Sequence, residues 1–323
     1  MSAASEVAPP RAGRAQRRIT PGKTGRRIGF FLLLALFVVA SLFPFYWIVV
    51  TSLKTPGEIA KGTTSLLPSH VTWSNYANDL TQQNFIRPLV NSAIVCVSAT
   101  ILTVIIAAPA GYALSRTRMR GRPLVLGFIL VAAFFPVIAM VGPMFIAYKR
   151  TGLLDTYPAL IISYLIYTLP IATWLLASYF SQIPKELEEA ALVDGSTRLR
   201  TLRKIVMPVA LPGVFTAAIL SFILAWNDFL LALSFMTTPN MYTAPVAIVS
   251  LGQSQYQVFY NLIDAAVVII SIPVALLVIF AQRRIVSGLT AGSFRWRRPG
   301  QRPGDDEPLD LAGALDYLQD LTL

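Results

Sequence analysis

The sequence is poor in charge. Asp, Glu, Lys and Arg make up 13% of its 323 residues, whereas a soluble domain carries about 25%. The shortage is concentrated in uncharged intervals, most of them longer than the ~20 residues that a helix needs to cross a bilayer. These intervals are 28–53, 88–115, 123–148, 156–184, 205–227, 229–263 and 265–282. Such a chain cannot cover a water-facing surface, so the sequence predicts an integral membrane protein.

Residues that build most catalytic and metal sites are scarce. Cys96 is the one cysteine, which excludes an intramolecular disulfide and a multi-cysteine metal or redox site. His70 is the one histidine, which excludes paired-histidine zinc motifs and a relay of several histidines. The P-loop pattern GxxxxGK[ST] is absent, as are HExxH and GxSxG. We therefore expect no enzyme activity and no cofactor bound by this chain.

The predicted fold class is all-α, a polytopic membrane protein with six transmembrane helices. The spans are expected near residues 28–50, 90–114, 124–147, 157–180, 213–235 and 260–281. Interval 229–263 is not counted as a seventh span, because its many Thr, Asn and Gln residues would be costly in lipid. Residues 1–27 are expected to form a disordered basic tail, with a mitochondrial presequence as the weaker alternative. Residues 297–323 form an acidic tail.

The positions of Lys and Arg predict the orientation. With six spans, the two tails and the loops 115–123 and 181–212 share one side of the membrane and hold 22 of the 27 basic residues. Basic loops stay cytoplasmic, so both termini are predicted to be cytoplasmic. This placement explains the net charge of +11 without nucleic acid, while juxtamembrane arginines favour anionic lipid.

The cytoplasmic loop 181–212 is predicted to form a helix–glycine–helix elbow. Pro184 introduces a run of helix formers, and Gly195 supplies a helix end or a sharp turn. Apolar residues then recur at helical spacing between basic residues, which predicts a second, amphipathic helix near the interface. Pro208 and Pro212 are expected to break this helix before the fifth span. The alternative is two short helices whose charges are merely solvated.

The spacing in this loop resembles the EAA loop of ABC importer permeases. That pattern is E-A-A, three residues, Gly, nine residues, Ile, one residue, Leu-Pro; it is matched by Glu189-Ala190-Ala191, Gly195, Ile205 and Met207-Pro208, with Met207 in place of Leu. Two further segments, Trp226-Asn227-Asp228 and 283–292, resemble the maltose- and trehalose-type sugar permeases, specifically the second of their two unlike permease subunits. The similarity covers roughly residues 28–296.

The resemblance implies a division of labour among subunits. A second, unlike permease would complete the translocation path, two ATPase subunits would hold ATP and magnesium, and an extracytoplasmic binding protein, lipid-anchored or periplasmic, would deliver a sugar. The chain would lie in the bacterial plasma membrane and contact membrane lipid, with no nucleic-acid partner. The residues implied in ATPase coupling are Glu189, Ala190, Ala191, Asp194, Gly195, Ile205 and Pro208. The acidic tail is either disordered or touches the ATPase.

Candidate substrate contacts are predicted in the outer half of the membrane and in the outer loop. Trp226, Asn227 and Asp228 are substrate-path candidates, because amide and carboxylate groups bind sugar hydroxyls and an intramembrane carboxylate faces water or a partner. The alternative is a buried polar pair that holds helices together. In the outer loop 237–260, the candidates for contact with the binding protein are Gln253, Gln255 and Tyr256; the alternative is a re-entrant loop packed on the bundle.

The expected function is therefore that of a permease subunit in an ATP-driven carbohydrate importer, for a disaccharide such as trehalose or maltose or for an oligosaccharide. The alternatives are an ABC permease for an amino sugar, a glycerol-phosphate-type solute or a polyol, and a secondary transporter driven by an ion gradient. A secondary transporter would be expected to carry more ionisable residues within its spans.

Overall fold

The computed structural model describes residues 21–61, 65–81, 83–116, 121–251 and 258–293, with the side chains of 28–61, 65–81, 83–116, 121–251 and 258–280. Nearly all of the regular structure in these residues is helical, which confirms the predicted all-α fold class. The helices are α1 Pro21–Ser52, α2 Pro56–Ala60, α3 Ser74–Thr81, α4 Ile86–Arg116, α5 Arg122–Ala133, α6 Val137–Thr151, α7 Tyr157–Gln182, α8 Glu186–Val193, α9 Arg198–Thr201, the π-helix η1 Leu202–Val206, α10 Met207–Val209, α11 Leu211–Trp226, α12 Leu230–Phe235, the 3₁₀-helix η2 Pro239–Met241, α13 Ala244–Ser250 and α14 Tyr260–Ser293.

Four helices of the described residues are long and apolar enough to cross a membrane, and six spans result if each of two bent helix pairs counts as one. The long helices are Ile28–Ser52, Ile86–Arg116, Tyr157–Gln182 and Tyr260–Phe280. The bent pairs are Arg122–Ala133 with Val137–Thr151, and Arg198–Val209 with Leu211–Trp226. The predicted number of spans therefore corresponds to the upper end of this range.

Several helix boundaries differ from those expected. α1 begins at Pro21, so residues 21–27 are helical rather than part of the tail; proline is favoured at a first helical position. The expected helix 124–147 is two helices bent by 79°, because Pro136 lacks an N–H and disfavours a helical residue before it. The expected helix 213–235 is interrupted after Trp226, and α14 continues past residue 281 to Ser293.

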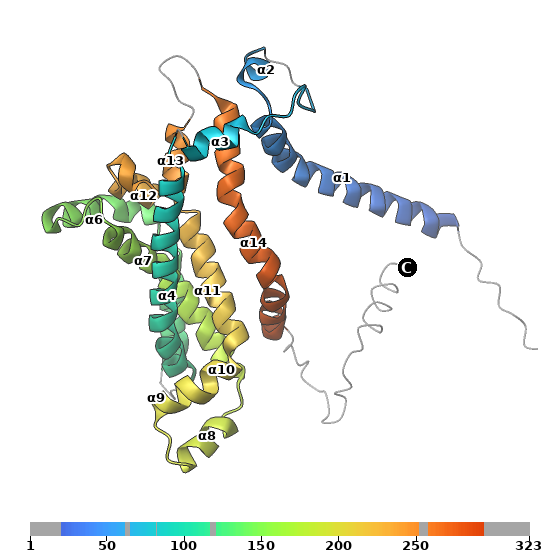
Figure 1. Ribbon diagram of the computed structural model, residues 1–323. Coiled ribbons are helices and arrows are strands. Elements are labelled where there is room, and N and C mark those ends of the chain that lie inside the picture. The colour runs from blue at the N-terminus through green and yellow to red at the C-terminus, as the bar shows by residue number, and fades with distance from the viewer. Residues whose placement is uncertain (1–20, 62–64, 82, 117–120, 252–257, 294–323) are drawn as a thin grey trace, which may run out of the picture. The chain divides into compact units, whose positions relative to one another are not determined.

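The contacts divide the chain after Tyr46, and the unit Trp47–Arg297 carries every site considered below. Within it, α4, α7 and α11 pack side by side (Figure 1). Small residues permit the close approach: a Cβ added at Gly111 of α4 would lie 2.9 Å from the backbone N of Ala177 in α7. Gly213 of α11 lies directly against the Tyr179 ring of α7 in the same way.

The two ends of this bundle differ. Figure 1 shows α8, α9 and α10 at one end and α3, α12 and α13 at the other. The loops that the sequence assigns to opposite sides of the membrane therefore lie at opposite ends of the bundle. At the α13 end, Asn91 Nδ2 donates to the carbonyl oxygens of Asn240 and Tyr242, both at 2.9 Å. The loop after α12 is thus tied to the end of α4.

Candidate functional site: the elbow between α7 and α11

Residues 184–210 form an elbow with a defined turn. α8 ends at Val193, and Gly195 adopts a left-handed conformation with φ of 79°. The Ser196 N–H donates to the Ala191 carbonyl at 2.9 Å and the Gly195 N–H to the Leu192 carbonyl at 3.1 Å. These are the paired bonds of a Schellman motif, which glycine favours because it has no Cβ. The helix end predicted at Gly195 is present.

A second helix starts directly after this turn. Thr197 caps it, with the side-chain oxygen accepting from the Arg200 N–H at 3.4 Å. The helix runs from Arg198 to Val209 and meets α11 at an angle of 83°. The helix ends at Val209, one residue after Pro208, and Pro212 lies in the first turn of α11, so the break expected before the fifth span is present. The π-turn before Pro208 changes the hydrogen-bond register, since the Met207 N–H donates to the Leu202 carbonyl.

The second helix of the elbow is fixed to the bundle by apolar packing. Leu202, Val206 and Ala210 are buried in one cluster with residues of α4, α7 and α11. The members from those three helices are Ala107, Ala108, Ala172, Leu176, Phe180 and Ala217. Close packing of this kind resists relative movement, so a displacement of the second helix would carry the ends of the three helices with it.

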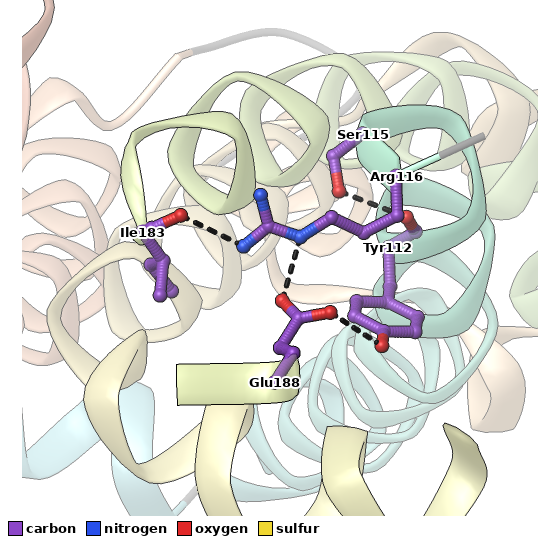
Figure 2. Close-up of polar contacts among 5 residues, drawn as sticks. All are labelled: Tyr112, Ser115, Arg116, Ile183 and Glu188. Carbon is purple, nitrogen blue, oxygen red and sulfur yellow. Dashed lines mark hydrogen bonds and ion pairs between the residues drawn. The ribbon is translucent and has the colours of Figure 1, made fainter. Parts of the chain in front are cut away.

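α8 is attached differently, through a buried carboxylate (Figure 2). Arg116 Nε donates to Glu188 Oε1 at 2.6 Å, and the Tyr112 hydroxyl donates to Glu188 Oε2 at 2.8 Å. Arg116 also donates from a terminal guanidinium nitrogen to the Ile183 carbonyl at 2.9 Å. The side chains of the ion pair are only 8% and 10% exposed. Charge-assisted bonds in such surroundings are stronger than neutral ones in water.

The outward face of the elbow mixes aliphatic side chains with charged ones, among them Glu186, Glu189, Arg198 and Arg200. Leu187, Leu192, Val193 and Leu199 are exposed, with Val193 at 88%. The buried residues of α8 are Glu188 and Ala191. α8 therefore turns one charged side chain, Glu188, toward the bundle, while its larger aliphatic side chains face away together with Glu186 and Glu189. Exposed apolar residues next to one another in a loop mark a surface for a protein partner.

The structure separates the predicted coupling residues into two groups. Glu189, Ala190 and Asp194 are exposed, whereas Ala191 is buried and Ile205 is partly buried. Glu188 was missed by sequence reasoning, although it precedes the EAA pattern directly. Glu188 lies three residues before Ala191, so the two residues share one face of α8. It was missed because the amphipathic pattern of a helix normally places apolar residues, and not charged ones, on the buried face.

The predicted substrate-path residues do not form one site. Trp226 is buried, stacks on Phe222 and donates its indole N–H to the Ile270 carbonyl at 3.2 Å. Asp228 accepts from the Tyr164 hydroxyl at 3.1 Å and the Ala232 N–H at 3.0 Å, so it caps α12. Asn227 is exposed and donates to the Ile223 carbonyl within its own helix at 2.8 Å.

The outer loop 237–260 is partly helical. Its helix α13 contributes Ala244 and Ala247 to an apolar cluster with Phe85 of the α4 end and Ala266 of α14. The described part of the loop therefore packs on the bundle. Gln253, Gln255 and Tyr256, the candidates for contact with the binding protein, lie outside the described residues.

Comparisons with known proteins agree with this architecture. Residues 101–290 match the family described as "Binding-protein-dependent transport system inner membrane component". The chain is 40% identical over 82% of its length to the sulfoquinovosyl glycerol transport system permease protein of Agrobacterium fabrum, covering 93% of that protein. It is 40% identical over 84% of its length to the trehalose transport system permease protein of Mycobacterium tuberculosis, covering 98% of it.

A further relative and a solved structure extend the likeness. The trehalose/maltose transport system permease protein of Thermococcus litoralis is 37% identical over 84% of this chain, which covers 97% of that relative. A crystal structure of a bacterial ABC transporter involved in alginate import contains a chain with the same fold, with a TM-score of 0.70 at 24% identity over 83% of this chain and 99% of the other. The chain therefore belongs to the family of inner-membrane components of binding-protein-dependent ABC transport systems.

Proposed function

We propose that this chain is a permease subunit of an ATP-driven importer of carbohydrate, a disaccharide such as trehalose or maltose or an oligosaccharide. The names of the relatives support the substrate class, since they include trehalose, maltose and sulfoquinovosyl glycerol systems. Amino sugars, polyols and glycerol-phosphate-type solutes are the other classes to include in a ligand screen of the binding protein.

In the proposed complex, this chain works with three other kinds of protein. A second, unlike permease forms the other half of the path, two ATPase subunits carry ATP and magnesium, and an extracytoplasmic binding protein brings the sugar. The family description supports a binding protein in general terms. The elbow and both chain termini are assigned to the cytoplasm, because the elbow side of the chain holds most Lys and Arg residues.

The observation that carries the proposal is the outward face of the elbow. Its exposed aliphatic side chains, with Ala190 small enough for close approach, suit a cleft on the ATPase. Glu189 is exposed beside them and is free to pair with a cation of the partner or to cap a backbone group. Closure of the ATPase dimer would press on this face, and the second helix would transmit the movement to α4, α7 and α11.

Reconstitution in proteoliposomes tests this proposal. The complete complex should import sugar only with ATP, and Ala190→Arg, which places a long cation on the docking face, should reduce ATPase binding and uptake at least ten-fold. Ser181→Arg, on an exposed part of α7 outside the elbow, is the matched control and should leave both unchanged. Sugar uptake by this chain in the absence of any ATPase would contradict the proposal and favour an ion-gradient transporter.

A further inference from the structure

The ion pair between Glu188 and Arg116 has a place in the fold that docking does not explain. It faces the bundle, on the side of α8 away from the outward face. We propose that Glu188 is a positioning residue for energy coupling, whose paired carboxylate fastens α8 to the inner end of α4. This inference rests on the proposed docking of an ATPase at the elbow, and it identifies the contact that passes the ATPase movement directly to α4.

The need for such a contact follows from how the two halves of the elbow are held. The second helix is fixed by Leu202, Val206 and Ala210 in the apolar cluster. That cluster contains no member of α8; the larger aliphatic residues Leu187, Leu192 and Val193 are exposed, and Ala191 offers only a methyl group to the buried side. Among the polar side-chain contacts of the described residues, the bonds of Glu188 join α8 to α4. Without them, a push on α8 would be absorbed by rotation about the turn at Gly195.

The geometry makes this a rigid fastening. Both carboxylate oxygens are used, one by Arg116 and one by Tyr112, so the carboxyl group cannot rotate without breaking a bond. Arg116 is itself held by the Ile183 carbonyl at the end of α7 (Figure 2). Since Arg116 and Tyr112 lie one turn apart at the end of α4, the force is applied along that helix.

The distinguishing measurement is the number of sugar molecules imported per ATP hydrolysed by the reconstituted complex. In Glu188→Ala, Arg116 and Tyr112 lose their shared acceptor; we expect the complex to assemble and hydrolyse ATP while this ratio falls at least ten-fold. Glu188→Gln keeps an acceptor oxygen for Arg116 and should lower the ratio about three-fold. Glu186→Ala, which removes an exposed carboxylate of the same helix that is not among the coupling residues, should leave the ratio unchanged.

A distance measurement shows whether Glu188 holds α8 against α4 during ATP binding or only stabilises the folded protein. Spin labels at Val193→Cys on α8 and Ile105→Cys on α4, both exposed, are introduced with Cys96→Ala. With Glu188 present, the label distance should stay constant between nucleotide-free and ATP-bound complexes; with Glu188→Gln it should change or broaden on ATP binding. An unchanged import ratio in Glu188→Gln, with an unchanged distance, would overturn the inference. Failure of the wild-type chain to bind an ATPase would instead refute the proposed function.

Discussion

The two segments that the sequence singles out, the elbow and residues 226–228, use their side chains in opposite ways. The elbow buries a charged residue, Glu188, and exposes aliphatic residues such as Val193. In the other segment, the aromatic Trp226 is buried and the carboxylate of Asp228 bonds within the chain. The first arrangement leaves aliphatic side chains exposed at the elbow, whereas the second joins α11 to α14 and caps α12. Similarity to a functional motif thus has different structural consequences in the two places.

The largest effect on transport is expected at the turn of the elbow. Gly195→Val places a β-branched residue at φ of 79°, which costs about 2 kcal/mol or more. We expect ATP-driven uptake to fall at least ten-fold, because α8 loses its orientation. A Cβ at this position would have open space around it, so the effect comes from the backbone conformation alone.

Gly195→Asn is the matched control, because asparagine tolerates the left-handed region. Uptake by this variant should remain within about two-fold of the wild type. Both variants are compared by uptake of radiolabelled sugar at equal amounts of assembled complex. Wild-type uptake by Gly195→Val would show that the turn is not needed for coupling.

The next effect concerns the neighbours Asn227 and Asp228. Asp228→Ala removes the acceptor for the Tyr164 hydroxyl and for the Ala232 N–H, and should destabilise the protein by about 2 kcal/mol. Asn227→Ala loses one bond on an exposed surface and should change stability by less than about 0.5 kcal/mol. Thermal unfolding in detergent measures both.

Uptake kinetics then show whether Asn227 or Asp228 contacts the substrate or only supports the fold. A substrate-path role for Asn227 predicts a higher KM for uptake in Asn227→Ala without loss of thermal stability. If Asp228→Ala unfolds at the wild-type temperature but fails to transport, Asp228 serves the path rather than the packing of α12.

The smallest effect contrasts two buried carboxylates. Glu188 has a cation, whereas neither carboxylate oxygen of Asp79 in α3 has a hydrogen-bond partner among the described residues, and Asp79 is 0% exposed. Burial raises the pKa of Asp79 to about 7. Because the unfolded chain ionises nearer pH 4, the folded state loses stability as the pH rises from about 4 to about 7. Asp79→Asn should remove this loss and raise the unfolding temperature at pH 8 by several degrees.

Glu58 gives the control of opposite sign. The backbone N–H of Ser69 lowers the pKa of the carboxyl of the partly buried Glu58, so Glu58→Gln should not reproduce the gain at pH 8. The measurement is the unfolding temperature of the purified protein between pH 5 and pH 8. An equal pH dependence in wild type and Asp79→Asn would show that Asp79 does not ionise in this interval.

Much of the fold was predictable because long apolar intervals have few alternatives to helices in a membrane. The interruptions were less predictable. Pro136 separates α5 from α6, and the second helix of the elbow ends one residue after Pro208, but the π-helix Leu202–Val206 that precedes Pro208 was not predicted. α11 ends at Trp226, and Asp228 then caps α12 and accepts from the Tyr164 hydroxyl of α7. The bond to α7 joins distant parts of the chain, so a local sequence pattern could not predict it.

The turn of the elbow could be predicted from the sequence, but the orientation of the α8 side chains could not. Gly195 predicts the turn, because a glycine after a run of helix formers favours a left-handed helix end. The direction of α8 could not be derived, because Leu187, Leu192 and Val193 face outward and Glu188 faces inward. Only the position of Arg116, 72 residues earlier in the chain, explains that orientation.

We propose above that the outward face of the elbow lies in the cytoplasm against an ATPase. This proposal is tested most directly by a cysteine at Val193 in a Cys96→Ala background, with Val258→Cys at the opposite end of the bundle as control. Val193→Cys should cross-link to the ATPase and resist a membrane-impermeant thiol reagent added to intact cells, while Val258→Cys should be labelled by that reagent and form no such cross-link. Labelling of Val193→Cys from outside, or no cross-link in an active complex, would contradict the account.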